Sequence, residues 1–236
     1  KVHRAAQVFF KKHAKLKGMR DLDWFAVGGR NVTDTILDEV LVCKNLDQLT
    51  LAYASISPAK LKLIGKLKTL SILSVPGCKL EPEVISAWSQ LKSLWDINLD
   101  DTQISVGTIT WLSNIASLRR VSMNRVQFDD YATEKLADLK QVSELQLAGV
   151  QIPNDQLMPL LVDSNIESIN LSGWKIDDKL LQQLLNTQSL KRMTLHDCGI
   201  TQETMRQIME RLPTAYIDLG SAQARLDPAL QQELEW

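Results

Sequence analysis

The chain of 236 residues repeats itself every 24 residues, and this period limits its possible folds more than any other feature of the sequence. Counted from Leu22, apolar residues return at positions one, four, six and eleven of each repeat. Position one holds Leu22, Leu46, Leu70, Leu94, Leu118, Val142, Ile166, Leu190 and Thr214; position four holds Phe25, Leu49, Leu73, Ile97, Val121, Leu145, Ile169, Met193 and Ile217; position six holds Val27, Leu51, Val75, Leu99, Met123, Leu147, Leu171, Leu195 and Leu219; position eleven holds Val32, Ile56, Leu80, Ile104, Phe128, Ile152, Ile176, Ile200 and Ala224. Thirty-five of these 36 positions are apolar, whereas a composition of 44% hydrophobic residues gives about 16 by chance.

Each repeat predicts one strand followed by one helix. Positions four and six alternate with polar neighbours, as in a strand with one buried face, so positions three, five and seven face outward. Helix-start residues follow position eleven: Thr33, Asp34, Ser57, Ser105, Asp129, Asp177, Thr201 and Asp227. A stripe such as Leu61, Ile64 and Leu67 then marks one helix face. The sequence therefore predicts an α/β solenoid of nine repeats, with a curved parallel sheet inside and helices outside.

Segments 99–105 (LDDTQIS) and 195–201 (LHDCGIT) carry a family resemblance. The chain resembles leucine-rich-repeat proteins over residues 22–236, and these segments look like the bacterial variant with 24-residue repeats. One departure concerns position nine, which never holds the Asn of the family. That position holds Arg30, Ala54, Cys78, Thr102, Val126, Val150, Trp174, Cys198 and Ala222. We therefore expect packing, rather than a ladder of Asn side chains, to hold the turn after each strand.

Both ends of the repeat array are expected to be capped, because a solenoid otherwise exposes an apolar edge. Residues 1–21 predict a basic amphipathic capping helix ahead of the repeat domain 22–236, in which residues 214–236 form the C-terminal cap. Residues 1–20 carry a charge of +7 and the remaining body −8. The basic face could alternatively contact anionic lipid. The first residue is Lys rather than Met, so an upstream start, signal peptide or anchor could have been removed. The start resembles bacterial membrane-anchored leucine-rich-repeat proteins, which implies a membrane-anchored or extracytoplasmic bacterial location.

Several classes of function are not expected from the residues. The acidic body lacks the basic stripe that nucleic acid requires, and no run of 18 apolar residues suggests a membrane span. The three cysteines include no C-x-x-C pair, so zinc and disulfides are not expected. His196, Asp197 and Cys198 invite a catalytic interpretation, but Cys198 falls at inward position nine. We therefore expect no catalytic, cofactor or metal site.

One group of acidic residues falls on a single predicted strand. Asp96, Asp100 and Asp101 could offer oxygens to calcium, although a solvated acidic patch is the favoured interpretation.

The outward strand positions form the candidate binding surface. Trp24 and Trp95 point away from the core, whereas Trp88, Trp111 and Trp174 are expected inside it. Aromatic and Arg side chains beside small residues are typical of protein interfaces. The expected partner-binding residues are Trp24, Gln48, Ile72, Trp95, Asp96, Asn98, Asp100, Arg120, Asn124, Arg192 and His196.

The function expected from this surface is a non-catalytic, monomeric scaffold that binds a protein or peptide on its inner strand face. Two alternatives stay open. The chain could be a structural accessory or membrane-anchored domain of a larger protein, or a receptor for a small molecule.

Overall fold

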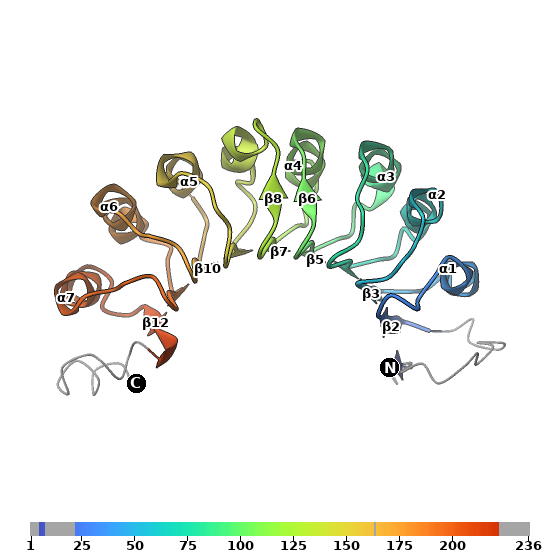
Figure 1. The fold of residues 1–236 in the computed structure, drawn as a ribbon, viewed down its shortest axis with the longest axis horizontal. Helices are drawn as coiled ribbons and strands as arrows, with labels where there is room; N and C mark the ends of the chain where they lie inside the picture. The colour runs from blue at the N-terminus through green and yellow to red at the C-terminus, as the bar shows by residue number, and fades with distance from the viewer. Residues whose placement is uncertain (1–4, 8–21, 163, 222–236) are drawn as a thin grey trace.

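A computed structural model describes residues 5–7, 22–162 and 164–221 of the chain. These residues form an arc, with strands along its concave side and helices along its convex side (Figure 1). The described residues contain one ten-stranded sheet in which each strand pairs in parallel with the next. Its strands are β1 (Ala5–Gln7), β2 (Trp24–Gly28), β3 (Gln48–Ala52), β4 (Ile72–Ser74), β5 (Asp96–Asn98), β7 (Arg120–Ser122), β9 (Glu144–Gln146), β10 (Ser168–Asn170), β11 (Arg192–Thr194) and β12 (Tyr216–Asp218).

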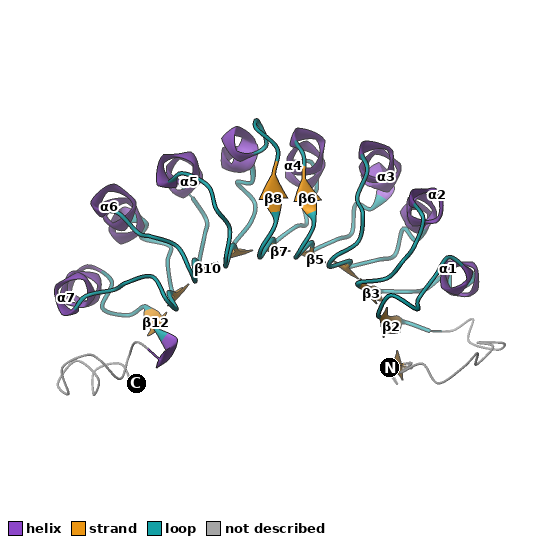
Figure 2. Cartoon of the chain, in the orientation of Figure 1, coloured by secondary structure: helices purple, strands orange, loops and turns teal. Residues whose placement is uncertain are grey.

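The 24-residue period sets the register of this sheet. Leu49 pairs with Leu73 and Leu73 with Ile97, so each position-four residue lies beside the position-four residue of the next repeat. Two further strands, β6 (Gln103–Ile104) and β8 (Gln127–Phe128), pair in a small second sheet between the main sheet and the helices (Figure 2). The prediction of a parallel-sheet solenoid with helices outside is confirmed.

The helices are short, and several begin at the predicted cap residues. The α-helices are α1 (Thr35–Val40), α2 (Pro58–Leu61), α3 (Pro82–Ala87), α4 (Val106–Ser113), α5 (Asn154–Leu161), α6 (Asp178–Asn186) and α7 (Gln202–Arg211); the 3₁₀ helices are η1 (Lys62–Lys66), η2 (Trp88–Gln90) and η3 (Thr133–Asp138). The side chains of Ser57, Ser105, Asp177 and Thr201 each accept a hydrogen bond from a backbone N–H in the first turn.

Two of the expected cap residues, Asp129 and Asp34, accept hydrogen bonds from a neighbouring repeat. Asp129 accepts hydrogen bonds from Ala132 N–H at 2.8 Å and from Val106 N–H at 3.2 Å. Asp34 does not cap its own helix, which corrects the prediction: it accepts from the N–H and the hydroxyl of Ser57, both at 2.7 Å, and so joins two repeats. Asp227 lies outside the described residues.

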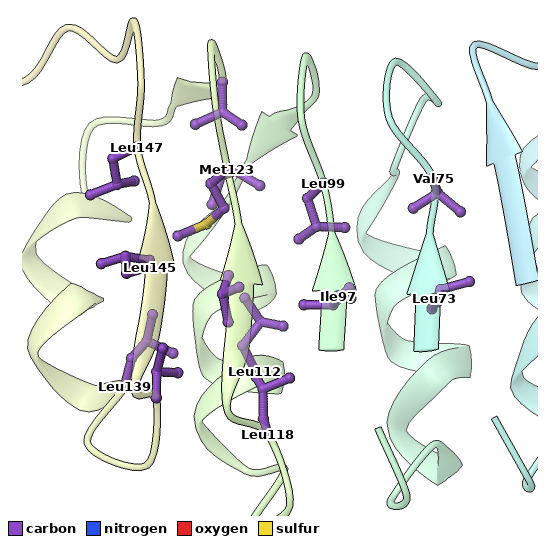
Figure 3. Packing of buried hydrophobic residues seen from close by; sticks show 14 of the residues in the cluster. Leu73, Val75, Ile97, Leu99, Leu112, Leu118, Met123, Leu139, Leu145 and Leu147 are labelled. Carbon is purple, nitrogen blue, oxygen red and sulfur yellow. The ribbon is translucent and has the colours of Figure 1, made fainter. Parts of the chain in front are cut away.

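The core runs without interruption between the sheet and the helices. All residues at positions four and six, from Phe25 to Leu219, are at most 5% exposed. Figure 3 shows members of this cluster, including Ile97, Leu99 and Leu147, pointing from the strands toward the helices. The helix stripe of Leu61, Ile64 and Leu67 is buried against them. Because one repeat has no closed core of its own, the repeats stabilise one another.

The expectation that packing alone holds the turn at position nine is wrong for four repeats. In these repeats the side chain at position nine donates a hydrogen bond to a carbonyl at position six of its own or the preceding repeat. The pairs are Cys78 to Leu51 at 3.2 Å, Thr102 to Leu99 at 2.6 Å, Trp174 to Leu147 at 2.7 Å and Cys198 to Leu171 at 3.1 Å. Buried carbonyls need a donor, and thiol, hydroxyl and indole groups supply it here in place of Asn.

The N-terminal segment also departs from the prediction. Ala5–Gln7 form strand β1 and pair with β2, so the helix expected over residues 1–21 is wrong for these three residues. The edge of β2 offers backbone N–H and C=O groups, and a strand can pair with them where a helix cannot. The rest of residues 1–21, and residues 222–236 of the expected C-terminal cap, lie outside the described residues. In the described part of the chain, no helix has the length and apolar character needed to cross a membrane.

Candidate functional site

The concave face of the sheet is the candidate site. We define it as the side chains at positions three, five and seven of the repeat strands, together with Trp95 at position two. These side chains stand away from the core, and within the described residues no second layer covers them (Figure 1). The expected site residues from Trp24 to His196 lie on this face, where most are partly exposed, and Trp95 is 38% exposed. Of the aromatic residues expected in the core, Trp88, Trp111 and Trp174 are buried.

A row of charged side chains crosses the middle of this face. The sheet register places Asp96 of β5 beside Arg120 of β7, and Arg120 beside Glu144 of β9. Arg120 donates to Glu144 Oε2 from Nε and lies within 2.8 Å of the same oxygen through Nη2. Its Nη1 reaches Asp96 Oδ2 only at 3.4 Å. The guanidinium carbon lies 5.6 Å from the centroid of the Trp95 ring, which is within cation–π range.

A shallow depression of about 410 Å³ lies over this row, and we call it the central hollow. It spans strands β4, β5, β7 and β9. Its lining side chains are Ile72, Ser74, Asp96, Asn98, Arg120, Ser122, Glu144 and Gln146, with Leu73 beneath. The hollow thus brings together four of the expected site residues, Ile72, Asp96, Asn98 and Arg120, from three adjacent strands.

The carboxylates of the three acids in the fourth repeat differ in how many hydrogen bonds they accept. Asp100 accepts from Ser122 Oγ at 2.6 Å, from Asn124 N–H at 2.9 Å and from Asn124 Nδ2 at 3.2 Å. Asp101 receives two 2.8 Å hydrogen bonds from Arg125, and these hold the pKa of its carboxyl below the usual value. Asp96 has one long contact, and burial raises its pKa.

These contacts also bear on calcium binding. The oxygens of Asp100 and Asp101 are engaged by side chains and an amide of the fifth repeat, and among the described residues no group of three His, Cys, Asp or Glu could hold a metal ion.

The residues at position eight, just after each strand, form a rim along the carboxyl ends of the strands, and this rim was not predicted from the sequence. Position eight is left-handed in every described repeat that begins between Leu22 and Leu190, at Gly29, Tyr53, Gly77, Asp101, Arg125, Gly149, Gly173 and Asp197. Each non-glycine residue there costs on the order of 1 kcal/mol. Tyr53 lies over Gly77, where an added Cβ would come within 2.3 Å of its ring, and its hydroxyl donates to Asp101. The glycines recurring at this position were the available signal.

Four of the remaining expected residues lie farther from the central hollow. Trp24 and Gln48 are on β2 and β3, whereas Arg192 is on β11 and His196 follows it. His196 Nε2 lies 2.8 Å from Asp218 Oδ1. Burial raises the pKa of Asp218, but a hydrogen bond from Gly220 N–H and the contact with His196 outweigh it, so the pKa is lowered overall. His196 thus lies against an acid of the next strand.

The thiol chemistry suggested by His196, Asp197 and Cys198 finds little support in the geometry. Cys198 is buried and bonds to the carbonyl of Leu171, and burial raises its pKa. Burial likewise raises the pKa of Cys78 to about 11. A raised pKa suppresses the reactive thiolate. Cys43, Cys78 and Cys198 are all buried and free of disulfides.

The comparisons with known proteins show only the fold of this chain. No family model matches the chain, and neither does any curated protein. Among solved structures, the internalin InlF from Listeria monocytogenes superposes with a TM-score of 0.52 at 14% identity, over 93% of this chain and 54% of the internalin. TLR13, solved in complex with the RNA ssRNA13, superposes with a TM-score of 0.57 at 17% identity, over 94% of this chain and 32% of TLR13. The chain thus spans about half of the first protein and a third of the second. These likenesses and the repeat geometry show that the chain has the leucine-rich-repeat fold.

Proposed function

We propose that this chain is a non-catalytic binding protein whose concave face docks a protein or a peptide. The observation that carries the proposal is the central hollow, where Ile72 lines an uncovered sheet together with the ion-paired Arg120, whose guanidinium lies over the Trp95 ring. Buried aromatic and Arg anchors supply most of the binding energy in protein interfaces.

The contacts on this face favour a preformed surface. Arg120 is held by Glu144, and Asn124 is held by Asp100 and in turn accepts from Ala148 N–H at 2.7 Å. Side chains that are already fixed lose little conformational entropy when a partner docks. The rim adds a second fixed row, because Tyr53 and Arg125 both bind Asp101. A partner would therefore meet ordered polar groups beside partly exposed apolar ones.

A nucleic acid is the less favoured partner, although the fold neighbour TLR13 was solved with RNA. A polyanion needs cations that are free to meet phosphate. Arg120 on this face and Arg125 on the rim are both paired with carboxylates, and the hollow contains two acids for one arginine. The charge of −8 on the body after residue 20 also disfavours a polyanion.

The proposal is tested with peptides as probes. Short random peptides displayed on phage are selected on the immobilised full chain, and the affinity of the enriched peptides is measured for variants. Trp95→Ala is expected to weaken binding by about 1 to 4 kcal/mol without changing the unfolding curve. Lys135→Ala, on the convex side, is the matched control and is expected to leave the affinity unchanged. Equal affinity of all enriched peptides for wild type and for Trp95→Ala, with losses on Lys135→Ala, would refute concave-face docking.

A further inference from the structure

Asp96 is the least satisfied of the carboxylates around the central hollow. Its side chain is 17% exposed, and its contact within the described residues is the 3.4 Å approach of Arg120 Nη1. The same guanidinium gives its two shorter contacts to Glu144. Asp96 therefore shares one arginine with a second carboxylate that is better placed to use it. A half-buried carboxylate in this situation favours an additional positive charge.

The surroundings of Asp96 indicate the shape of that cation. On the β7 side of Asp96 stands Arg120, but on the β4 side the paired residue is Ile72, which is partly exposed and apolar. The indole of Trp95 is the preceding side chain, and the hydroxyl of Ser74 lines the same hollow. An aliphatic stem can pack on Ile72 and Trp95 while its charged end meets Asp96. Lysine and arginine have this combination of stem and charge.

We propose that the central hollow receives a lysine or arginine side chain from the protein or peptide that docks on the concave face. This inference rests on the proposed function and adds the chemistry of the partner. Charge complementarity supports it, because the hollow has a net charge of −1 from Asp96, Glu144 and Arg120, and the body after residue 20 carries −8. Opposite charges steer encounter and select partners.

An acidic anchor from the partner fits the same hollow less well. Arg120 already donates to Glu144 through Nε and lies 2.8 Å from it through Nη2, so a carboxylate would have to displace a formed ion pair. It would also approach Asp96 and Glu144, two like charges. A basic side chain instead adds a donor to Asp96 and displaces no contact of the described residues.

The test uses two variants of the full chain and one matched control against the phage-selected peptides. Ile72→Arg fills the hollow with a cation of the chain itself and is expected to abolish binding. Asp96→Asn keeps the shape and removes the charge, and it is expected to weaken binding about 10- to 100-fold. Glu167→Gln removes one acid that directly precedes β10, outside the hollow, where Glu167 pairs with Lys191 at 2.9 Å. It is expected to change affinity by less than about threefold.

The outcomes separate this inference from the proposed function. Enrichment of Lys or Arg beside an apolar residue, with binding lost on Ile72→Arg and on replacing the peptide lysine by norleucine, supports both. Peptides that are lost on Ile72→Arg but are neutral or acidic, or that bind Asp96→Asn as well as wild type, would overturn the basic anchor and leave concave docking intact. A selection that yields no peptides, or only peptides indifferent to Ile72→Arg, would contradict both.

Discussion

Replacing Leu147 by alanine tests the repeat register and the energetic role of a single core residue. Leu147 occupies position six of the sixth repeat and is fully buried. Its N–H donates to Asn170 O at 2.9 Å, and its carbonyl accepts from the Trp174 indole at 2.7 Å. These two hydrogen bonds fix the backbone on both sides of the side chain. The structure around the site can therefore relax only partly into the space left by the missing atoms.

The expected loss follows from this rigidity. Removing buried Leu atoms costs the transfer free energy plus a cavity term, about 2 to 5 kcal/mol in total. The neighbouring Gln146 points to the concave face and is partly exposed, so Gln146→Ala is expected to cost less than about 0.5 kcal/mol. Urea denaturation followed by circular dichroism gives both free energies of unfolding. Equal losses for the two variants would refute the assignment of inward and outward positions.

Three further predictions concern burial and charge. All three cysteines should resist a thiol reagent at pH 8 in the native protein, because they are buried and the pKa of Cys78 is about 11; rapid labelling without unfolding would argue against this packing. Asp177→Ala should cost about 0.5 to 2 kcal/mol at neutral pH, because it removes the cap of α6. The Leu180 N–H lowers the pKa of Asp177 below its ordinary 3.8, so that stabilisation is present above 3.8 and lost as the pH falls through the lowered value; an unchanged difference down to pH 2 would contradict the cap. Asp96→Asn should not lower the free energy of unfolding at pH 7 by more than about 0.5 kcal/mol. Burial raises the pKa of Asp96, so the folded state favours the neutral carboxyl, and the stability that this form contributes is lost as the pH rises. A larger loss in urea would show that the charge of Asp96 stabilises the fold.

Most of the fold could be predicted from the repeat period, because the period specifies which way each side chain points. An apolar residue at position four must point inward in every repeat, and Leu49, Leu73 and Ile97 do so in register. Strand β1 was not predicted because the apolar residues near the N-terminus have a helical spacing, with lysines on the opposite face, and this pattern fits a helix. The pattern contains no information about the open edge of β2 with which Ala5–Gln7 pair.

The candidate site was predictable as a surface but not as a set of contacts. Outward positions follow from the strand period, which placed Ile72, Asp96 and Arg120 together. The unequal sharing of Arg120 between two acids depends on rotamers and distances that no spacing rule gives. Likewise, Tyr53 reaches Asp101 across an intervening glycine and 48 positions of sequence, in a left-handed conformation that Tyr rarely adopts.

Site-specific photo-cross-linking tests the central claim most directly. The photoreactive amino acid p-benzoylphenylalanine is placed at Gln48 or Gln146 on the concave face, and at Lys62 or Lys135 on the helices, each in a separate full-length variant. A phage-selected peptide is bound and irradiated, and the adducts are located by mass spectrometry. Docking on the concave face predicts adducts from Gln48 and Gln146 and none above background from the two helix positions. Adducts that form mainly from Lys62 or Lys135 would contradict it.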